Sequence, residues 1–195
     1  MPFRLLPTVV GVIAAFLVFG ATVGGADSVA PHALAAATPH KPRHKLPPRT
    51  NLKTSKDLWA TINVCDTKRA ANTIGVRGSM PGLGNRISRL EMRIRIQFKS
   101  KADGKWHNAD DSADSGWKKI GHTRRQVIES GQDFTFMAPT DGGSHLLRGA
   151  VRFRWKRKGH GVVARRRRVT EAGHASTASA DPKGYSAAQC EITAP

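Results

Sequence analysis

Two segments of the chain carry an apolar residue at every second position. They span residues 90–98 and 147–155. The alternating positions are Leu90, Met92, Ile94, Ile96 and Phe98 in the first segment, and Leu147, Gly149, Val151, Phe153 and Trp155 in the second. A period of two over such a length predicts a strand with one face in the core and the other in water.

Shorter segments between turn residues predict further strands. The candidates are 58–65, 74–78, 117–121, 133–137, 161–169 and 186–192. Glycine- and proline-containing turns separate them at 80–82, 103–104, 130–131, 141–143, 158–161 and 181–184. No apolar stripe of 3.6-residue period follows residue 57. The pattern predicts an all-β domain, a β-sandwich of about seven to eight strands, with a small β-barrel as the alternative.

The first 26 residues have the pattern of an export signal. A charged start that ends at Arg4 precedes an apolar run over 5–23, and the small residues 24–26 then offer a cleavage site before Asp27. The alternative is an uncleaved membrane anchor, since the apolar run is almost long enough to span a bilayer. We expect cleavage and a secreted or cell-surface, extracytoplasmic protein.

Residues 27–57 differ in composition from the rest of the chain. They are rich in proline, histidine and basic residues and show no apolar periodicity. Such a segment does not bury a core, so we expect a disordered linker at 27–57 and a folded domain at 58–195. The alternative role for the linker is a basic arm over 41–56 that grips a polyanion.

The chain has two cysteines, Cys65 and Cys190, near the two ends of the predicted domain. An exported protein meets oxidising conditions, and two cysteines allow one intramolecular pairing, so the sequence predicts a disulfide between them. The alternatives are a metal pair or a nucleophilic thiol. The absence of a CxxC motif and of histidines at ligand spacing disfavours both.

Three segments together carry a resemblance. The runs 59–65, 147–155 and 181–190 look like uncharacterised exported bacterial proteins with an immunoglobulin-like β-sandwich domain. The chain departs from the true immunoglobulin pattern at Tyr185, which lies five residues before Cys190 and not two. The resemblance implies a fold and an export route. It implies no functional residues, because sandwich folds host many unrelated activities.

Positive charge is the main functional clue. Lysine and arginine number 32 against 14 acidic residues, for a formal net charge of +18. A hairpin turn at 158–161 would set the run 165–168 beside the arginines of 148–156, although only alternate members of the run share a face in a regular strand. Arg93 and Arg95 would extend that face if their strand lies in the same sheet. The candidate polyanion-binding residues are Arg148, Arg152, Arg154, Lys156, Arg165, Arg166, Arg167 and Arg168.

The expected partner is an anionic polymer or an envelope surface. Phe153 and Trp155 alternate with the arginines and therefore point into the core, which leaves no stacking surface for bases. Sequence-specific nucleic-acid binding is not expected. No cofactor is implied, no protein partner can be named, and membrane contact is transient unless the N-terminal segment stays uncleaved.

Catalytic motifs are weak. Ser144 and His145 have Asp141 nearby, but adjacency in sequence does not make a triad, and no GxSxG elbow is present. The acidic stretch 110–114 lacks the spacing of a calcium loop. We therefore expect an exported non-catalytic binding module. The alternative is a structural or protein-interaction domain whose charge only serves solubility.

Overall fold

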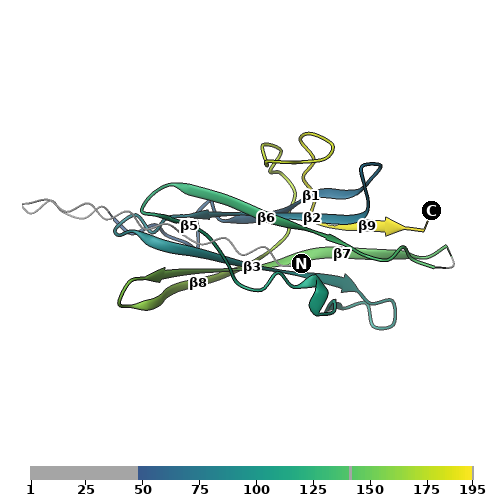
Figure 1. Ribbon diagram of the computed structural model, residues 1–195, viewed down its shortest axis with the longest axis horizontal. Helices are drawn as coiled ribbons and strands as arrows, with labels where there is room; N and C mark the ends of the chain where they lie inside the picture. Colours follow the sequence, from purple (N-terminus) through teal and green to yellow (C-terminus); the bar gives the residue numbers. More distant parts are fainter. Residues whose placement is uncertain (1–47, 141, 195) are drawn as a thin grey trace, which may run out of the picture. The chain divides into compact units, whose positions relative to one another are not determined.

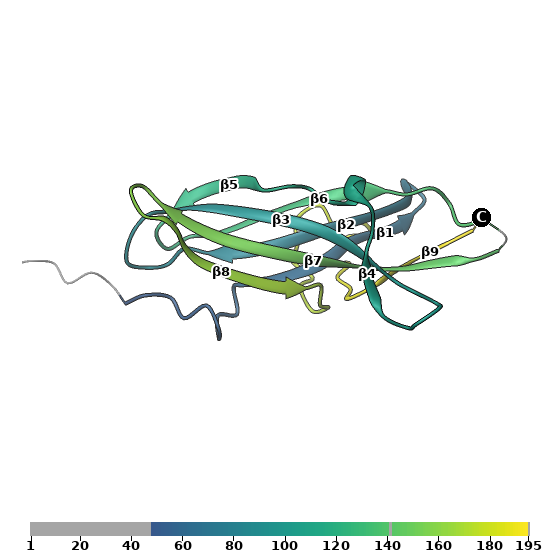
Figure 2. The same cartoon turned by 90° about the horizontal axis from the view of Figure 1, so that it is seen from below.

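The computed structural model describes residues 48–140 and 142–194. Over these residues the chain forms nine β-strands in two antiparallel sheets and no α-helix (Figures 1 and 2). The elements are β1 (Trp59–Thr67), β2 (Ala70–Pro81), β3 (Ser88–Lys99), β4 (Trp106–Asn108), the short 3-10 helix η1 (Asp111–Ala113), β5 (Lys118–Thr123), β6 (Val127–Thr135), β7 (Ser144–Arg157), β8 (Gly161–Val169) and β9 (Cys190–Thr193). The all-β prediction is confirmed.

The larger sheet has six strands arranged about the pair β3 and β7. On its free side β3 pairs with β5 near its start and with β4 near its end. On its own free side β7 pairs with β9 near its start and with β8 near its end. The smaller sheet has the order β1-β2-β6. Figure 2 shows β5, β3, β7 and β8 side by side.

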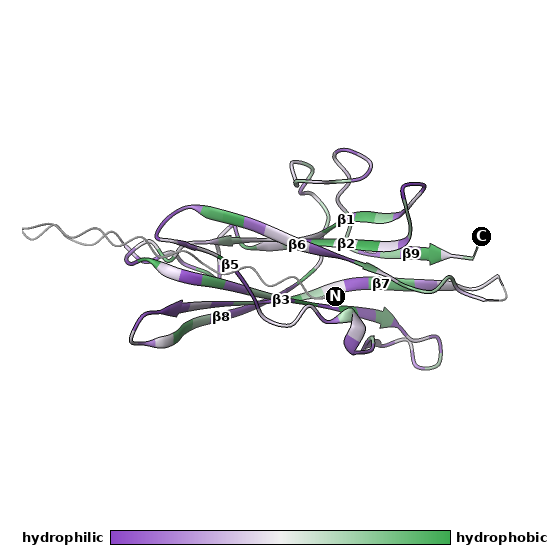
Figure 3. Cartoon of the chain, viewed as in Figure 1, coloured by the Kyte–Doolittle hydropathy of each residue, from purple (hydrophilic) through white to green (hydrophobic). Residues whose placement is uncertain are grey.

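Buried side chains of both sheets form one core. Ile62, Ile74 and Val76 of the smaller sheet share it with Phe153 and Trp155 of β7, and none of the five is exposed. The Trp155 indole donates a hydrogen bond to the Pro81 carbonyl oxygen at 2.8 Å. The alternation predicted for 147–155 is confirmed, and that predicted for 90–98 is confirmed as far as Ile96, whereas Phe98 is 38% exposed. Figure 3 shows hydrophilic stretches along β7 and β8.

Two glycines allow the sheets to approach closely. A Cβ atom at Gly78 of β2 would lie 2.9 Å from the terminal methyl group of Met92 on β3. A Cβ atom at Gly149 of β7 would lie 2.9 Å from the Val76 side chain on β2. Both distances are shorter than van der Waals contact. The branched Val76 side chain has little room to move, so the spacing of the layers depends on Gly149, whereas the flexible end of Met92 makes Gly78 less critical.

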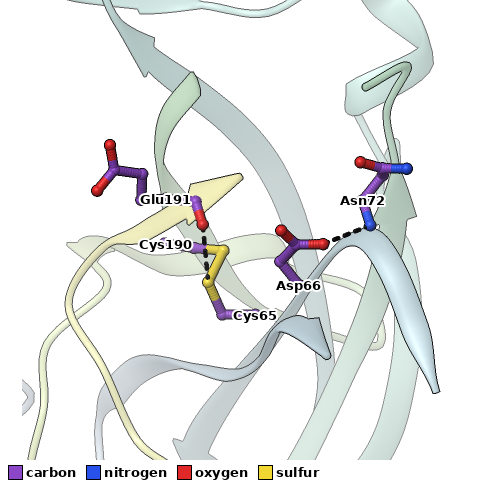
Figure 4. The surroundings of a disulfide bond; sticks show 5 residues. All are labelled: Cys65, Asp66, Asn72, Cys190 and Glu191. Carbon is purple, nitrogen blue, oxygen red and sulfur yellow. Dashed lines mark hydrogen bonds between the residues drawn. A yellow bond between two sulfur atoms is a disulfide. The ribbon is translucent and has the colours of Figure 1, made fainter. Parts of the chain in front are cut away.

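The predicted disulfide between Cys65 and Cys190 is confirmed. Cys65 lies on β1 in the smaller sheet and Cys190 begins β9 in the larger one, with their Cα atoms 5.4 Å apart. Figure 4 shows the bond beside the β1–β2 turn, where the Asn72 amide donates to Asp66 Oδ1 at 2.7 Å. The bond therefore joins the first and last strands and the two layers.

Residues 48–57 lie against the sheets, although the sequence places them in the linker. Leu52 is 4% exposed and belongs to the core, and the Thr50 amide donates to the Leu83 carbonyl at 2.9 Å. This single buried leucine lies outside any strand, so it produces no apolar periodicity in the sequence.

The predicted export signal at 1–26 and the linker residues 27–47 lie outside the described residues. Within the described ranges, no helix is long and apolar enough to cross a membrane.

Several strands differ in extent from their predicted ranges. The segment 74–78 is the middle of the longer β2, 133–137 overlaps the end of β6, and 186–192 overlaps β9 only from Cys190 onward. The strand β4 was not predicted at all. These strands carry glycines and polar residues at positions of either face, or are too short to show a period, so alternation alone does not define their ends.

Loss of the disulfide should strongly destabilise the domain. The bond closes a loop with a sequence separation of 125. In the chain-entropy model a loop of this length is worth about 5 kcal/mol. The double variant Cys65→Ser, Cys190→Ser should lose a large part of that free energy of unfolding in urea denaturation. Reduced and alkylated wild type is the control and should match it; an unchanged unfolding midpoint after reduction would contradict the assignment.

Candidate polyanion-binding face

The register of the larger sheet gathers arginines from three strands on one side. Arg93 of β3 pairs with Arg152 of β7, which in turn pairs with Arg167 of β8. In the next row, Arg154 of β7 pairs with Arg165 of β8. Directly paired residues project from the same face of a sheet, and Phe153 and Trp155 occupy the opposite, core-facing side. The arginines therefore lie on the outer face.

We call this surface the outer basic face. In β3, β7 and β8 it comprises nine cationic residues: Arg89, Arg93, Arg95, Arg148, Arg152, Arg154, Lys156, Arg165 and Arg167. Two carboxylates lie among them, those of Glu91 and Asp114. Arg93 and Arg95 therefore extend the face, as predicted.

Arg166 and Arg168 are not part of the outer basic face. They pair with the core-facing residues Phe153 and Val151, as the two-residue period of a strand requires. Arg168 Nε donates to the Leu58 carbonyl at 3.1 Å, and an Arg166 Nη group donates to the carbonyl of Arg165 at 2.7 Å. Only alternate members of the four-arginine run reach the face, and Arg168 instead holds the chain just before β1.

Glu91 neutralises one end of the face. Its side chain is 7% exposed; Arg154 Nε donates to it, and Lys156 Nζ lies 3.8 Å away. Arg89 Nε lies 2.8 Å from Glu91 Oε1, although the two are not aligned as a hydrogen bond. Burial alone would raise the pKa of Glu91, but the hydrogen bond from Arg154 and the three neighbouring charges together lower it. The carboxylate is therefore ionised at neutral pH.

Asp114 binds two of the three arginines of β3, Arg93 and Arg95. Both Arg93 Nε and Arg95 Nε donate to it at 2.8 Å, and its side chain is 6% exposed. The hydrogen bond from Arg93 holds the pKa of Asp114 well below its ordinary value, aided by the Gly116 amide and by Arg95 and opposed by burial. The same hydrogen bond raises the pKa of Arg93. Asp114 thus fixes both side chains on the outer face.

Two tryptophans lie on the face, which the sequence reasoning missed. The Arg148 guanidinium carbon lies 4.2 Å from the centre of the Trp106 ring, and that of Arg154 lies 3.9 Å from Trp117. Both rings are partly exposed. Phe153 and Trp155 point into the core as predicted. The aromatic residues of the outer face instead come from β4 and from the residue before β5, and each ring is covered on one side by an arginine.

The remaining arginines of the face are free of such partners. Within residues 48–140 and 142–194, the side chains of Arg152, Arg165 and Arg167 make no ion pair or hydrogen bond, and all three are exposed. Arg148 donates to Gln97 Oε1 at 3.0 Å. Burial, and secondly the charge of Arg167, lowers the pKa of Arg148. The middle and the β8 side of the face therefore carry uncompensated positive charge.

The other candidates from the sequence do not converge. Ser144 and His145 are successive residues of β7, so they project to opposite faces, and Asp141 lies outside the described residues. Among the residues described, no group of three or more histidine, cysteine or acidic side chains is placed to hold a metal ion. Of the basic arm, residues 41–47 also lie outside the described ranges.

Comparisons with known proteins return nothing for this chain: it matches no family model, no curated protein and no solved structure. The outer basic face is therefore interpreted from its own geometry.

Asp114 should be required for both stability and the order of the face. Asp114→Asn removes two charged hydrogen-bonded pairs and should cost about 2 kcal/mol of unfolding free energy at pH 7. Because folding lowers the pKa of Asp114, its contribution is fully present above the unfolded-state value of about 4 and is lost as the pH falls below it. Urea denaturation between pH 3 and pH 7 should show the gap between wild type and variant closing at low pH.

The exposed neighbour Asp111 gives the matched control. It makes no ion pair within the described residues, so Asp111→Asn should change the unfolding free energy by less than about 0.5 kcal/mol. Equal effects of the two substitutions would contradict the role given to Asp114.

Proposed function

We propose that the protein is an exported, non-catalytic binding module that engages anionic envelope or extracellular polymers through the outer basic face. The row formed by Arg93, Arg152 and Arg167 across three adjacent strands carries this proposal. Like charges directly opposite each other destabilise a sheet. Asp114 compensates Arg93, but the described residues provide no carboxylate for Arg152 or Arg167. A polymer bearing repeated negative charges would supply what the row lacks.

The chemistry of the arginines supports binding rather than bulk charge alone. A guanidinium group binds phosphate, sulfate or carboxylate through two parallel hydrogen bonds, and several aligned groups concentrate a positive field. Arg148 and Arg154 are laid over Trp106 and Trp117, which limits their motion. Side chains that are already ordered lose less conformational entropy when a ligand binds.

Export is supported by two separate features. The N-terminal 26 residues have the composition of a cleavable signal, and the Cys65–Cys190 disulfide is consistent with an oxidising compartment. The two antiparallel sheets joined by this bond are compatible with the immunoglobulin-like sandwich that we propose. In this proposal the folded domain presents the outer basic face to anionic material outside the cytosol.

Polymer binding should depend on where the arginines lie. The triple variant Arg152→Ser, Arg165→Ser, Arg167→Ser removes three exposed cations from the face. Its affinity for heparin or long-chain polyphosphate at 150 mM salt should fall at least tenfold. Because fewer counterions are released, the slope of log affinity against log salt should decrease by roughly 2. Fluorescence anisotropy over a salt series measures both quantities.

The control removes the same charge elsewhere. Arg124→Ser, Arg125→Ser, Lys183→Ser takes away three exposed cations that lie outside the outer basic face, and it should lower the affinity less than threefold. Equal losses in the two triple variants would show that only net charge matters, and would favour the alternative of a structural or protein-interaction domain whose charge serves solubility.

A further inference from the structure

A small depression opens in the middle of the outer basic face. Its floor is Ala150 of β7, and arginines from three strands surround it. The lining residues are Arg93, Arg95, Asn108, Ala150, Arg152 and Arg167. It has a volume of about 20 Å³, above the roughly 10–15 Å³ that one water molecule requires. The depression therefore has room for about one water-sized group, so a larger anion bound there would place one of its oxygen atoms in it.

Hydrogen-bond donors around the depression have no acceptor. Asp114 accepts hydrogen bonds from the Nε and Nη2 groups of Arg93 and Arg95. Over residues 48–140 and 142–194, the Nη1 groups of these two arginines have no hydrogen-bond partner. The guanidinium groups of Arg152 and Arg167 are likewise without partners in those ranges. The rim is thus lined by fixed donors on one side and free ones on the other.

The fourth strand around the depression adds a neutral donor. Asn108 of β4 accepts a hydrogen bond from Gln97 Nε2 through its Oδ1 atom at 3.1 Å. Its Nδ2 group is left to donate. Donors therefore come from β3, β4, β7 and β8, which surround the floor on several sides.

We propose that this depression is a subsite for one tetrahedral oxyanion, a phosphate or sulfate group of the bound polymer. The inference rests on the proposed function and identifies the charged group that the outer basic face selects. Four arginines and the single carboxylate of Asp114 leave an excess of positive charge around the Ala150 floor. A bound oxyanion would offset the repulsion between Arg152 and Arg167, the part of the arginine row that Asp114 leaves uncompensated.

The arrangement of donors favours a tetrahedral group over a carboxylate. A carboxylate accepts hydrogen bonds mainly within its own plane, so two guanidinium forks saturate it. Phosphate and sulfate oxygens project in three dimensions and accept donors from strands on several sides at once. Arg93 and Arg95 already bind one carboxylate, Asp114, through one edge each, and their Nη1 groups remain for a second anion.

Inorganic anions test the subsite without a polymer. Titration of the full mature protein with phosphate, sulfate and acetate, followed by NMR of the arginine Nε–H groups, should show saturable shifts with phosphate and sulfate and at least tenfold weaker binding of acetate. The separate phosphate and sulfate titrations identify which ion is preferred. Acetate binding as tight as that of the tetrahedral ions would overturn the proposal.

Two variants separate the shape of the depression from its charge. Ala150→Leu keeps every charge and fills the floor, so it should weaken phosphate or sulfate binding at least tenfold. Arg167→Gln changes an exposed side chain, so its effect does not depend on core packing, and it should also weaken binding about tenfold. Arg125→Gln, an exposed substitution outside the face, is the charge-matched control and should have less than a twofold effect.

The outcomes distinguish this inference from the proposed function. If Ala150→Leu or Arg167→Gln binds the inorganic ions as wild type does, the subsite is wrong. The outer basic face would still stand if heparin binding remained sensitive to the triple substitution of Arg152, Arg165 and Arg167. If those variants bind the inorganic ions as wild type does, and the triple variant binds heparin no more weakly than its control, both proposals are overturned.

Discussion

The pairing of β3 with β7 is the interaction on which the core and the charged face both depend. Ten residues of each strand stand in direct register. Every second pair, such as Leu90 with Trp155, contributes to the core, and the pairs between them, such as Arg93 with Arg152, form the outer basic face. A slip of one residue would exchange the two faces and bury the arginines. Hydrophobic burial on one side therefore fixes the position of each charge on the other.

Because the core fixes the register of β3 and β7, the arginines of the outer basic face stay opposite each other despite their mutual repulsion. Glu91 and Asp114, both nearly buried, are placed where they relieve part of it. Glu91 compensates Arg89 and Arg154, and Asp114 compensates Arg93 and Arg95. The two carboxylates thus stabilise one half of the face, and the half nearest β8 keeps its charge. Arginines on an edge strand such as β8 also hinder pairing with a second sheet. That role does not require further arginines opposite them on the central strands β3 and β7.

The parts of this structure that follow from sequence are those with a strict period. Alternation over 90–98 and 147–155 predicts both central strands and most of their core residues, although Phe98 is exposed. The same period predicts that alternate members of the run 165–168 share a face, and the pairing with β7 shows that these are Arg165 and Arg167. The two cysteines predict the bond between layers. Leu52 escapes prediction because one buried residue in a segment without a period resembles a linker residue. The roles of Asp114 and Trp106 escape it as well, because each arises from a partner more than 15 residues away along the chain.

The tryptophans divide the arginines of the face into two kinds. Arg148 and Arg154 both start on β7 and reach across β3, one to Trp106 on β4 and the other to Trp117 beside β5. Each guanidinium group has one flat side covered by a ring, and its Nε group donates to a side chain of β3, Gln97 for Arg148 and Glu91 for Arg154. Arg152 lies between them on the same strand and pairs with Arg167, and it has no ring or carboxylate partner within the described residues. Arginines held by rings therefore lie on either side of Arg152, which has no such partner among the described residues. A polymer running along β7 would meet fixed charges at both ends and adaptable ones in the middle, an order that lets the ends set its position while the centre adjusts to a single anionic group.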